Sequence, residues 1–106
     1  MNSINIVGRI TQDIELKMTP EGVDVCTFCV AVPRPGVKDV TDFFSCIAWR
    51  EKAVFCSNYF RKGDGICVTG ILTTRQYQDR EQNKKTVYEI LCREVSFGMG
   101  KKEDYA

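Results

Sequence analysis

Apolar and polar positions alternate along most of this chain, and a period of two is typical of half-buried β-strands. Ile4, Ile6, Gly8 and Ile10 alternate with polar or smaller neighbours, which predicts a first strand interrupted by one glycine. The same pattern predicts further strands over residues 26–32, 41–49, 65–77 (bending at Gly70) and 85–97. Between the second and third strands, residues 33–36 hold two prolines, which cannot donate to a sheet ladder, so the second strand stops there.

One segment has a helical pattern instead. In residues 51–60 the apolar side chains fall at i, i+1, i+4 and i+5 and so share one helix face. Arg61 and Lys62 suit the negative end of the helix dipole, and Gly63 suits a left-handed position beyond it. The resulting order β-β-β-α-β-β predicts an all-β fold with one short helix. It is typical of the OB-fold, a five-stranded Greek-key barrel with an α-helix between strands 3 and 4, although a plain α+β sandwich would give the same order.

The length of 106 residues allows one domain, for which we expect the bounds 1–99, followed by a short tail over 100–106. No apolar run approaches the roughly 20 residues that span a bilayer, and the N-terminus has no secretory signal, so we expect a cytoplasmic protein. The net charge is only +1, but residues 50–85 hold eight basic side chains against four acidic ones. A local basic patch of this kind can hold a phosphate backbone, whereas scattered surface lysines would be the simpler interpretation.

The chain has no histidine, which removes the usual general base and the commonest metal ligand. Cys26 and Cys29 form a CxxC, but residues three apart in a strand point to opposite faces, so the two thiols should diverge. We therefore expect no enzyme, no metal and no cofactor. All six cysteines are expected to be free thiols, mostly buried as small hydrophobic groups: Cys26, Cys29, Cys46, Cys56, Cys67 and Cys92.

The remaining signal is a set of aromatic side chains beside cations on strands. A flat ring can stack on any unpaired base while nearby cations hold phosphates, which gives affinity without sequence readout. Tyr77 is the best candidate, because it lies among polar residues near a loop. Phe43 and Phe44 must point to opposite faces, and Trp49 shares the face of Phe43 by its even spacing. Four other rings are assigned to the core: Phe28, Phe55, Phe60 and Phe97.

Three blocks of the chain form a specific set of motifs: Thr41-Asp42-Phe43-Phe44 leading to Trp49, then residues 58–64 (NYFRKGD), then residues 68–77 (VTGILTTRQY). In this order and spacing they resemble the bacterial single-stranded DNA-binding proteins, and the resemblance covers about residues 4–97. This family has an OB-fold and binds single-stranded DNA as a homotetramer, by base stacking and by pairing phosphates with lysine and arginine. The resemblance thus implies roles in DNA replication, recombination and repair, and a nucleoid-associated location.

Carried over by position, the resemblance implies that Phe43, Trp49 and Tyr77 stack on bases, and that Lys62 and Arg75 are basic contacts. Local charge and loop placement add three further candidates: Arg34, Arg50 and Lys84. Many relatives have a longer hairpin between the second and third strands, with another stacking ring, where this chain has the short residues 33–40. The chain also lacks the family's acidic tip, so recruitment of replication and repair proteins is doubtful.

Three other functions stay open. An OB-fold used for protein contacts, as in primosomal accessory proteins, would bury the aromatic face between subunits. An RNA-binding domain of the cold-shock type would lack this helix and carry a different aromatic motif. An enzyme is the most distant, because no catalytic constellation can be assembled from these residues.

Overall fold

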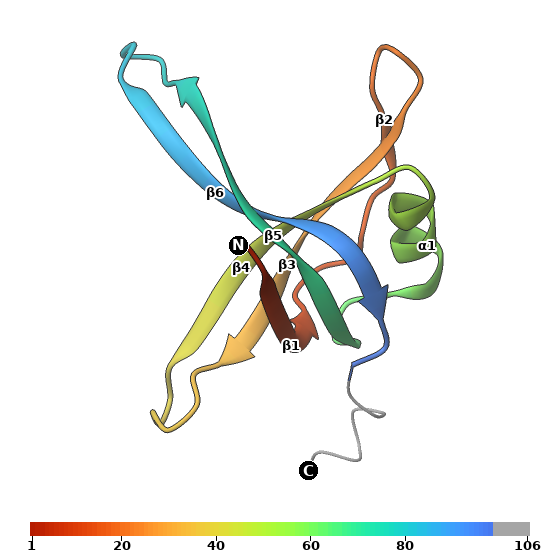
Figure 1. Cartoon of the computed structure of the whole chain (residues 1–106), viewed down its shortest axis with the longest axis vertical. Helices are drawn as coiled ribbons and strands as arrows, with labels where there is room; N and C mark the ends of the chain where they lie inside the picture. Colours follow the sequence, from red (N-terminus) through yellow and green to blue (C-terminus); the bar gives the residue numbers. More distant parts are fainter. Residues whose placement is uncertain (99–106) are drawn as a thin grey trace.

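The computed structural model describes residues 1–98, which form one helix and six strands, drawn in Figure 1. Residue 99 and the predicted tail over 100–106 lie outside the described residues. The elements are β1 (Ile4–Ile10), β2 (Lys17–Met18), β3 (Asp24–Pro33), β4 (Thr41–Trp49), α1 (Glu51–Tyr59), β5 (Gly65–Gln78) and β6 (Lys84–Ser96).

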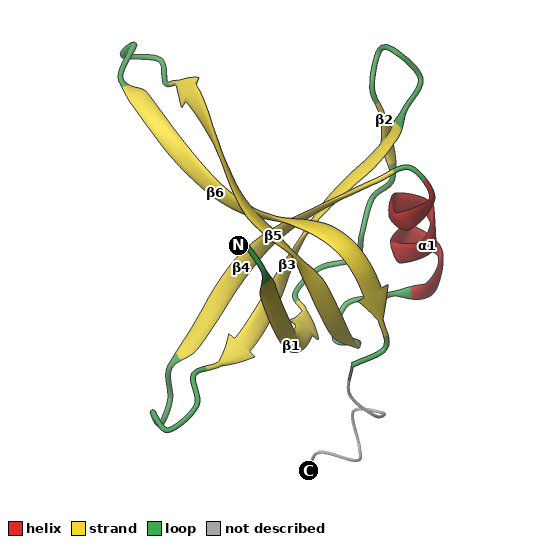
Figure 2. Cartoon of the chain, in the orientation of Figure 1, coloured by secondary structure: helices red, strands yellow, loops and turns green. Residues whose placement is uncertain are grey.

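Five of the strands close into a ring. The sheet order is β1-β5-β6-β4-β3-β2, and a second pairing of β1 with β3 joins the two sides. All the pairings are antiparallel except that of β4 with β6, which is parallel. The helix α1 follows β4 and precedes β5 in the chain, and it lies at one side of the barrel (Figure 2). Five barrel strands with a helix between the third and fourth are the OB-fold that the sequence pattern predicts.

The strand β2, which is outside the five-stranded ring, was not predicted. It has only two residues, Lys17 and Met18, which pair with Val25 and Asp24 of β3. Both β2 residues are exposed, so no alternation of buried and exposed positions marks the strand in the sequence. Together with β3 it forms a hairpin that projects from the barrel, as do the β3–β4 and β5–β6 hairpins (Figure 1).

Two glycines lie where barrel strands come closest. A Cβ added at Gly8 of β1 would overlap the carbonyl oxygen of Ala31 in β3, where the ring closes. A Cβ added at Gly70 of β5 would overlap the carbonyl oxygen of Leu91 in β6. A register shift between Thr69 and Gly70 marks a β-bulge at this point, so the predicted bend at Gly70 is a bulge that only glycine fits.

The core is lined by inward side chains from every barrel strand and from α1. Within residues 1–98, thirteen apolar residues are buried: Ile10, Cys26, Phe28, Val30, Cys46, Ala48, Ala53, Cys56, Phe60, Ile66, Val68, Ile90 and Cys92. Phe28 and Phe60 are core residues as predicted, and Phe55 packs against the core from a half-buried position. The prediction for Phe97 was wrong, because it follows β6 on the surface and stacks on Phe60 from outside, with ring centroids 4.6 Å apart.

Four cysteines fill space inside the barrel, and all six are free thiols, as expected. A hydrogen bond with Cys26, together with burial, raises the pKa of Cys56. A hydrogen bond with Cys46 and burial likewise raise the pKa of Cys92. These two side chains therefore remain protonated and apolar at neutral pH.

The C-terminus of α1 is capped by Arg61, which the sequence pattern predicted at this end of the helix. The Arg61 Nη1 donates hydrogen bonds to the carbonyl oxygens of Ser57, Asn58 and Phe60. Gly63 has a φ of 90°, the left-handed conformation expected for it, and lies in a turn closed by the Asp64 N–H donating to the Arg61 carbonyl.

Candidate nucleic-acid interface

The register of the strands shows which side chains share a face of the barrel. Cys46 pairs with Ile90, and both are buried, so their neighbours Ile47 and Leu91, which also pair, point outward. Because side chains alternate along a strand, every second residue of β4 and of β6 points to this same side. Their antiparallel partners on β5 share that side with β6. We define the outer face by the outward residues of these three strands, from Phe43 on β4, from Ile71 on β5 and from Lys85 to Leu91 on β6: Phe43, Ser45, Ile47, Trp49, Ile71, Thr73, Arg75, Tyr77, Lys85, Val87, Glu89 and Leu91.

All three predicted stacking rings belong to this outer face. Phe43 is 65% exposed, Tyr77 46% and Trp49 39%, while Phe44 next to Phe43 turns inward and packs on the core. The predictions that Phe43 and Phe44 diverge and that Trp49 shares the face of Phe43 are therefore confirmed. Large apolar rings left half-exposed on one side of a small domain are typical of a binding surface.

Each ring is near a different hairpin. Phe43 is near the start of β4, Tyr77 is near the end of β5, and Trp49 pairs with Val25, a residue that also pairs with β2. These three hairpins project from the barrel in different directions (Figure 1). Tyr77 is six residues along β5 from Ile71, the cross-strand partner of Leu91, which corresponds to about 20 Å of strand. Phe43 and Trp49 are also six residues apart on β4, again about 20 Å. A single base is far smaller than the separation of Phe43 and Trp49, so these two rings can stack only on different bases.

Cations accompany Tyr77 on the β5–β6 hairpin. Arg75 is on the same face two residues before Tyr77, and Lys85 is the direct cross-strand partner of Tyr77. The predicted Lys84 pairs instead with Gln78 and so alternates to the other face, although it lines a shallow cleft with Tyr77, Gln76 and Gln78. Lys85 was missed in the sequence because the choice between adjacent lysines depends on the hairpin register, which a polar loop does not reveal.

Arg50 lies beside Trp49, as predicted. The two residues line one shallow pocket together with Leu91 and residues of the β2–β3 turn. Arg50 has a φ of 59° and its N–H donates to the Asp24 carbonyl at 2.8 Å, so the chain turns sharply here from β4 into α1. The turn leaves Arg50 exposed at the pocket that Trp49 also lines.

Arg34 is held by a neighbouring carboxylate. Its Nε and Nη2 donate to Oδ2 and Oδ1 of Asp42 at 3.0 and 2.6 Å, and Asp42 alternates to the face opposite Phe43. The hydrogen bond from Arg34 and its charge hold the pKa of Asp42 below its ordinary value. The pair therefore persists at neutral pH and is lost only as the pH falls through that lowered pKa, below the roughly 3.9 of a free aspartate.

Lys62 does not come from the strands of the outer face. It lies in the turn after α1, where its backbone N–H donates to Oδ1 of Asp13 at 2.8 Å. Its side chain is exposed, and the turn is next to the end of β1, since the Gly63 N–H donates to the Ile10 carbonyl. The structure therefore places Phe43, Trp49, Tyr77 and Arg75 on the outer face, with Arg50 beside Trp49. Lys62, Arg34 and Lys84 do not belong to that face.

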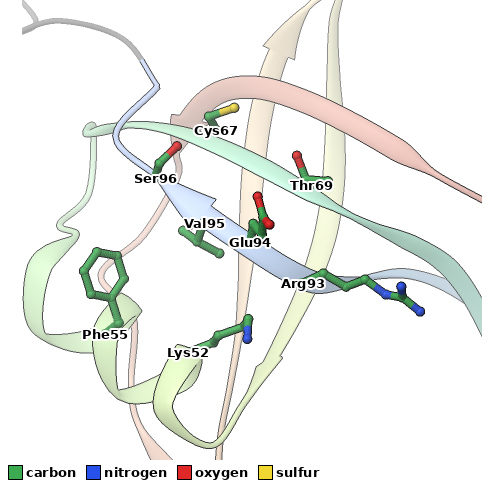
Figure 3. Close-up of a pocket in the computed structure, with 8 residues that line it drawn as sticks. All are labelled: Lys52, Phe55, Cys67, Thr69, Arg93, Glu94, Val95 and Ser96. Carbon is green, nitrogen blue, oxygen red and sulfur yellow. The ribbon is translucent and has the colours of Figure 1, made fainter.

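A second hollow lies between α1 and the ends of β5 and β6 (Figure 3). Phe55 and Lys52 border it from the helix, and Glu94 and Val95 border it from β6. None of the predicted site residues lines it. This hollow therefore contributes nothing to the aromatic site.

The residue that the sequence analysis missed most clearly is Glu89. It belongs to the outer face, yet its side chain is only 8% exposed, and its Oε1 accepts a hydrogen bond from the Nε of Arg75 at 3.0 Å. A carboxylate in the apolar segment 87–92 is the available sequence signal, since a charged residue is seldom buried without a partner.

The closed strand ring and its exposed aromatic face together define an OB-fold binding protein. Comparison with known proteins agrees with this class. The model of the single-strand binding protein family matches residues 1–98, so the chain belongs to that family. Members of this family are binding proteins and not enzymes, which agrees with the expectation from the sequence.

Similar curated proteins come from several bacteria. The chain is 38% identical over 102 residues to a single-stranded DNA-binding protein of Halalkalibacterium halodurans, covering 92% of this chain and 60% of the relative. It is 39% identical to a single-stranded DNA-binding protein of Bacillus cereus (92% and 59%) and 37% identical to single-stranded DNA-binding protein 1 of Staphylococcus aureus (92% and 60%). The chain thus spans about 60% of the length of these relatives. Within residues 1–98, no helix is long and apolar enough to cross a bilayer.

Proposed function

We propose that this chain binds single-stranded DNA without strong sequence preference. The observation that carries the proposal is the presence of Phe43, Trp49 and Tyr77, all at least 39% exposed, on one outer face. Unpaired bases offer flat faces to such rings, with roughly 1–3 kcal/mol for each base that stacks. The bases of a duplex are already stacked on one another, so the site favours single strands.

Phosphates are held by the cations that accompany the rings. Arg75 and Lys85 lie beside Tyr77, Arg50 lies beside Trp49, and Lys84 is close enough to the hairpin cleft to contact the backbone of the same strand. Each phosphate contact on a single strand releases counterions, with a slope in log affinity against log salt of about −0.7 per contact. Binding should therefore weaken as salt rises.

The physiological role in this proposal is to cover and protect exposed single strands during DNA replication, recombination and repair, in the bacterial cytoplasm at the nucleoid. The binding unit is the predicted domain 1–99. The similar bacterial proteins are named single-stranded DNA-binding proteins, which supports the binding of single strands. The chain acts as a homotetramer in this proposal, an assembly typical of the family.

The test uses Trp49, the single tryptophan, as an intrinsic reporter. Oligo-dT is titrated into the protein at two salt concentrations while tryptophan fluorescence is followed, and a gel shift confirms binding. Strong quenching that weakens with salt is expected. The absence of both a gel shift and fluorescence quenching at low salt would refute the proposal. An equal or stronger response to oligo-U would point to RNA as the target. The mass in solution tests the tetramer.

A further inference from the structure

Two arginines of this chain pair with carboxylates in different ways, and the difference bears on the binding site. Arg34 pairs with Asp42 through two donors, Nε and Nη2, in the fork geometry typical of arginine and carboxylate. Arg75 pairs with Glu89 through Nε alone. Among the described residues, Nε is the one side-chain donor of Arg75 that has a partner, so both of its terminal amino groups are left available.

The environment of the two pairs differs as well. The side chains of Arg34 and Asp42 are 52% and 32% exposed, so water surrounds the whole pair. Glu89 is 8% exposed, whereas its partner Arg75 is 59% exposed. The carboxylate is thus fixed in the protein, while the guanidinium extends from it toward solvent on the outer face, two residues from Tyr77.

We propose that Glu89 is a positioning residue that holds the Arg75 guanidinium by its Nε, so that the two terminal amino groups face a phosphate of the strand stacked on Tyr77. This inference rests on the proposed binding of single-stranded DNA. An arginine side chain that is free to rotate loses conformational freedom when it binds, and fixing it beforehand removes part of that cost. A guanidinium held by Nε still offers two separate amino groups in one plane to a phosphate, whereas a lysine has a single amino group for both partners.

A carboxylate near a phosphate site would on its own repel DNA, so the alternative makes an opposite prediction. If Glu89 only contributes negative charge, its removal strengthens binding. If it positions Arg75, its removal weakens binding about as much as removal of Arg75 itself. The sign of the effect therefore separates the two roles.

The experiment measures oligo-dT affinity by Trp49 fluorescence over a series of salt concentrations. Arg75→Ala is expected to bind about tenfold more weakly, with a salt slope smaller by about 0.7. Glu89→Leu, which is apolar and of similar size, should match Arg75→Ala in both values, and the double variant should be no weaker than either single one. Glu89→Gln keeps an acceptor for Nε and should restore most of the affinity.

Two further variants make the test decisive. Glu94→Gln removes the same charge from an exposed position on the same strand, and it should leave the salt slope unchanged. Arg75→Lys keeps the charge and leaves the buried Glu89 intact. If Glu89→Leu does not fold, this variant still tests whether the guanidinium geometry, and not the charge alone, gives the affinity. Arg75→Lys should bind almost as weakly as Arg75→Ala.

Unchanged or tighter binding by Glu89→Leu would overturn the inference, as would full additivity in the double variant or a wild-type salt slope in Arg75→Lys. Failure of the unmodified protein to bind oligo-dT would instead refute the proposed function.

Discussion

Replacement of Tyr77 by alanine tests the stacking site at the residue whose surroundings are simplest. Tyr77 is 46% exposed near the end of β5, outside the core, and no hydrogen bond of its hydroxyl is found within residues 1–98. Loss of one stacked base corresponds to roughly 1–3 kcal/mol, which is about 5- to 150-fold in affinity. The free energy of unfolding should change by no more than about 0.5 kcal/mol, because the position is on the surface.

The β5–β6 hairpin contains a matched control. Tyr88 is more exposed, at 63%, but it pairs with Thr74 and so points to the face opposite Tyr77. We expect Tyr88→Ala to bind within about twofold of the unmodified protein, and Tyr77→Phe, which keeps the ring, to do the same. The three variants therefore separate loss of a ring on the outer face from loss of a ring anywhere on the hairpin.

The assay is a titration with an oligo-dT of about 12 nucleotides, a length within the range that one OB-fold covers. Trp49 reports binding in all variants, because it is on β4 and is not altered. Light scattering on each variant shows whether its assembly has changed. The reasoning would be refuted if Tyr77→Ala bound as tightly as the unmodified protein, or if Tyr88→Ala weakened binding to the same extent with its assembly intact.

Three further outcomes follow from contacts described above. Arg34→Ala should leave the salt slope unchanged in the same titration, because Asp42 holds two donors of Arg34 on the face opposite Phe43; a drop of about 0.7 would show that Arg34 contacts a phosphate. Gly70→Ala should destabilise the barrel by about 1–3 kcal/mol, measured by denaturant unfolding, because a Cβ there overlaps the backbone of β6. A thiol reagent should modify the half-buried Cys29 and Cys67 of the native protein first, and the other four cysteines only after unfolding; early modification of all six would contradict the burial found here.

The sequence predicted the barrel well because its signal is local. Residues that alternate in the chain also alternate between core and solvent, so the five long strands and the single helix were identified within a few residues. The face shared by Phe43 and Trp49 followed from the same alternation. The position of Tyr77 relative to them did not, because it depends on the parallel pairing of Ile47 with Leu91, forty-four residues apart in the chain.

The ion pairs mark the limit of sequence analysis for the site. Arg34 and Arg75 look alike in the sequence, each a cation near a loop, and only their partners distinguish them. Asp42 holds two donors of Arg34, whereas the nearly buried Glu89 holds one donor of Arg75. Such pairs depend on side-chain geometry between strands, which residue type and spacing do not determine.

The distribution of the three rings over diverging hairpins also has a kinetic consequence. Phe43 and Trp49 are about 20 Å of strand apart, and Tyr77 is on another hairpin. In the proposed binding mode, a nucleic acid can therefore leave one ring while the other two still hold it. Each partial release costs roughly 1–3 kcal/mol, far less than complete dissociation. In the proposed mode the strand is thus released in small steps, so tight binding and rapid exchange are compatible on this surface.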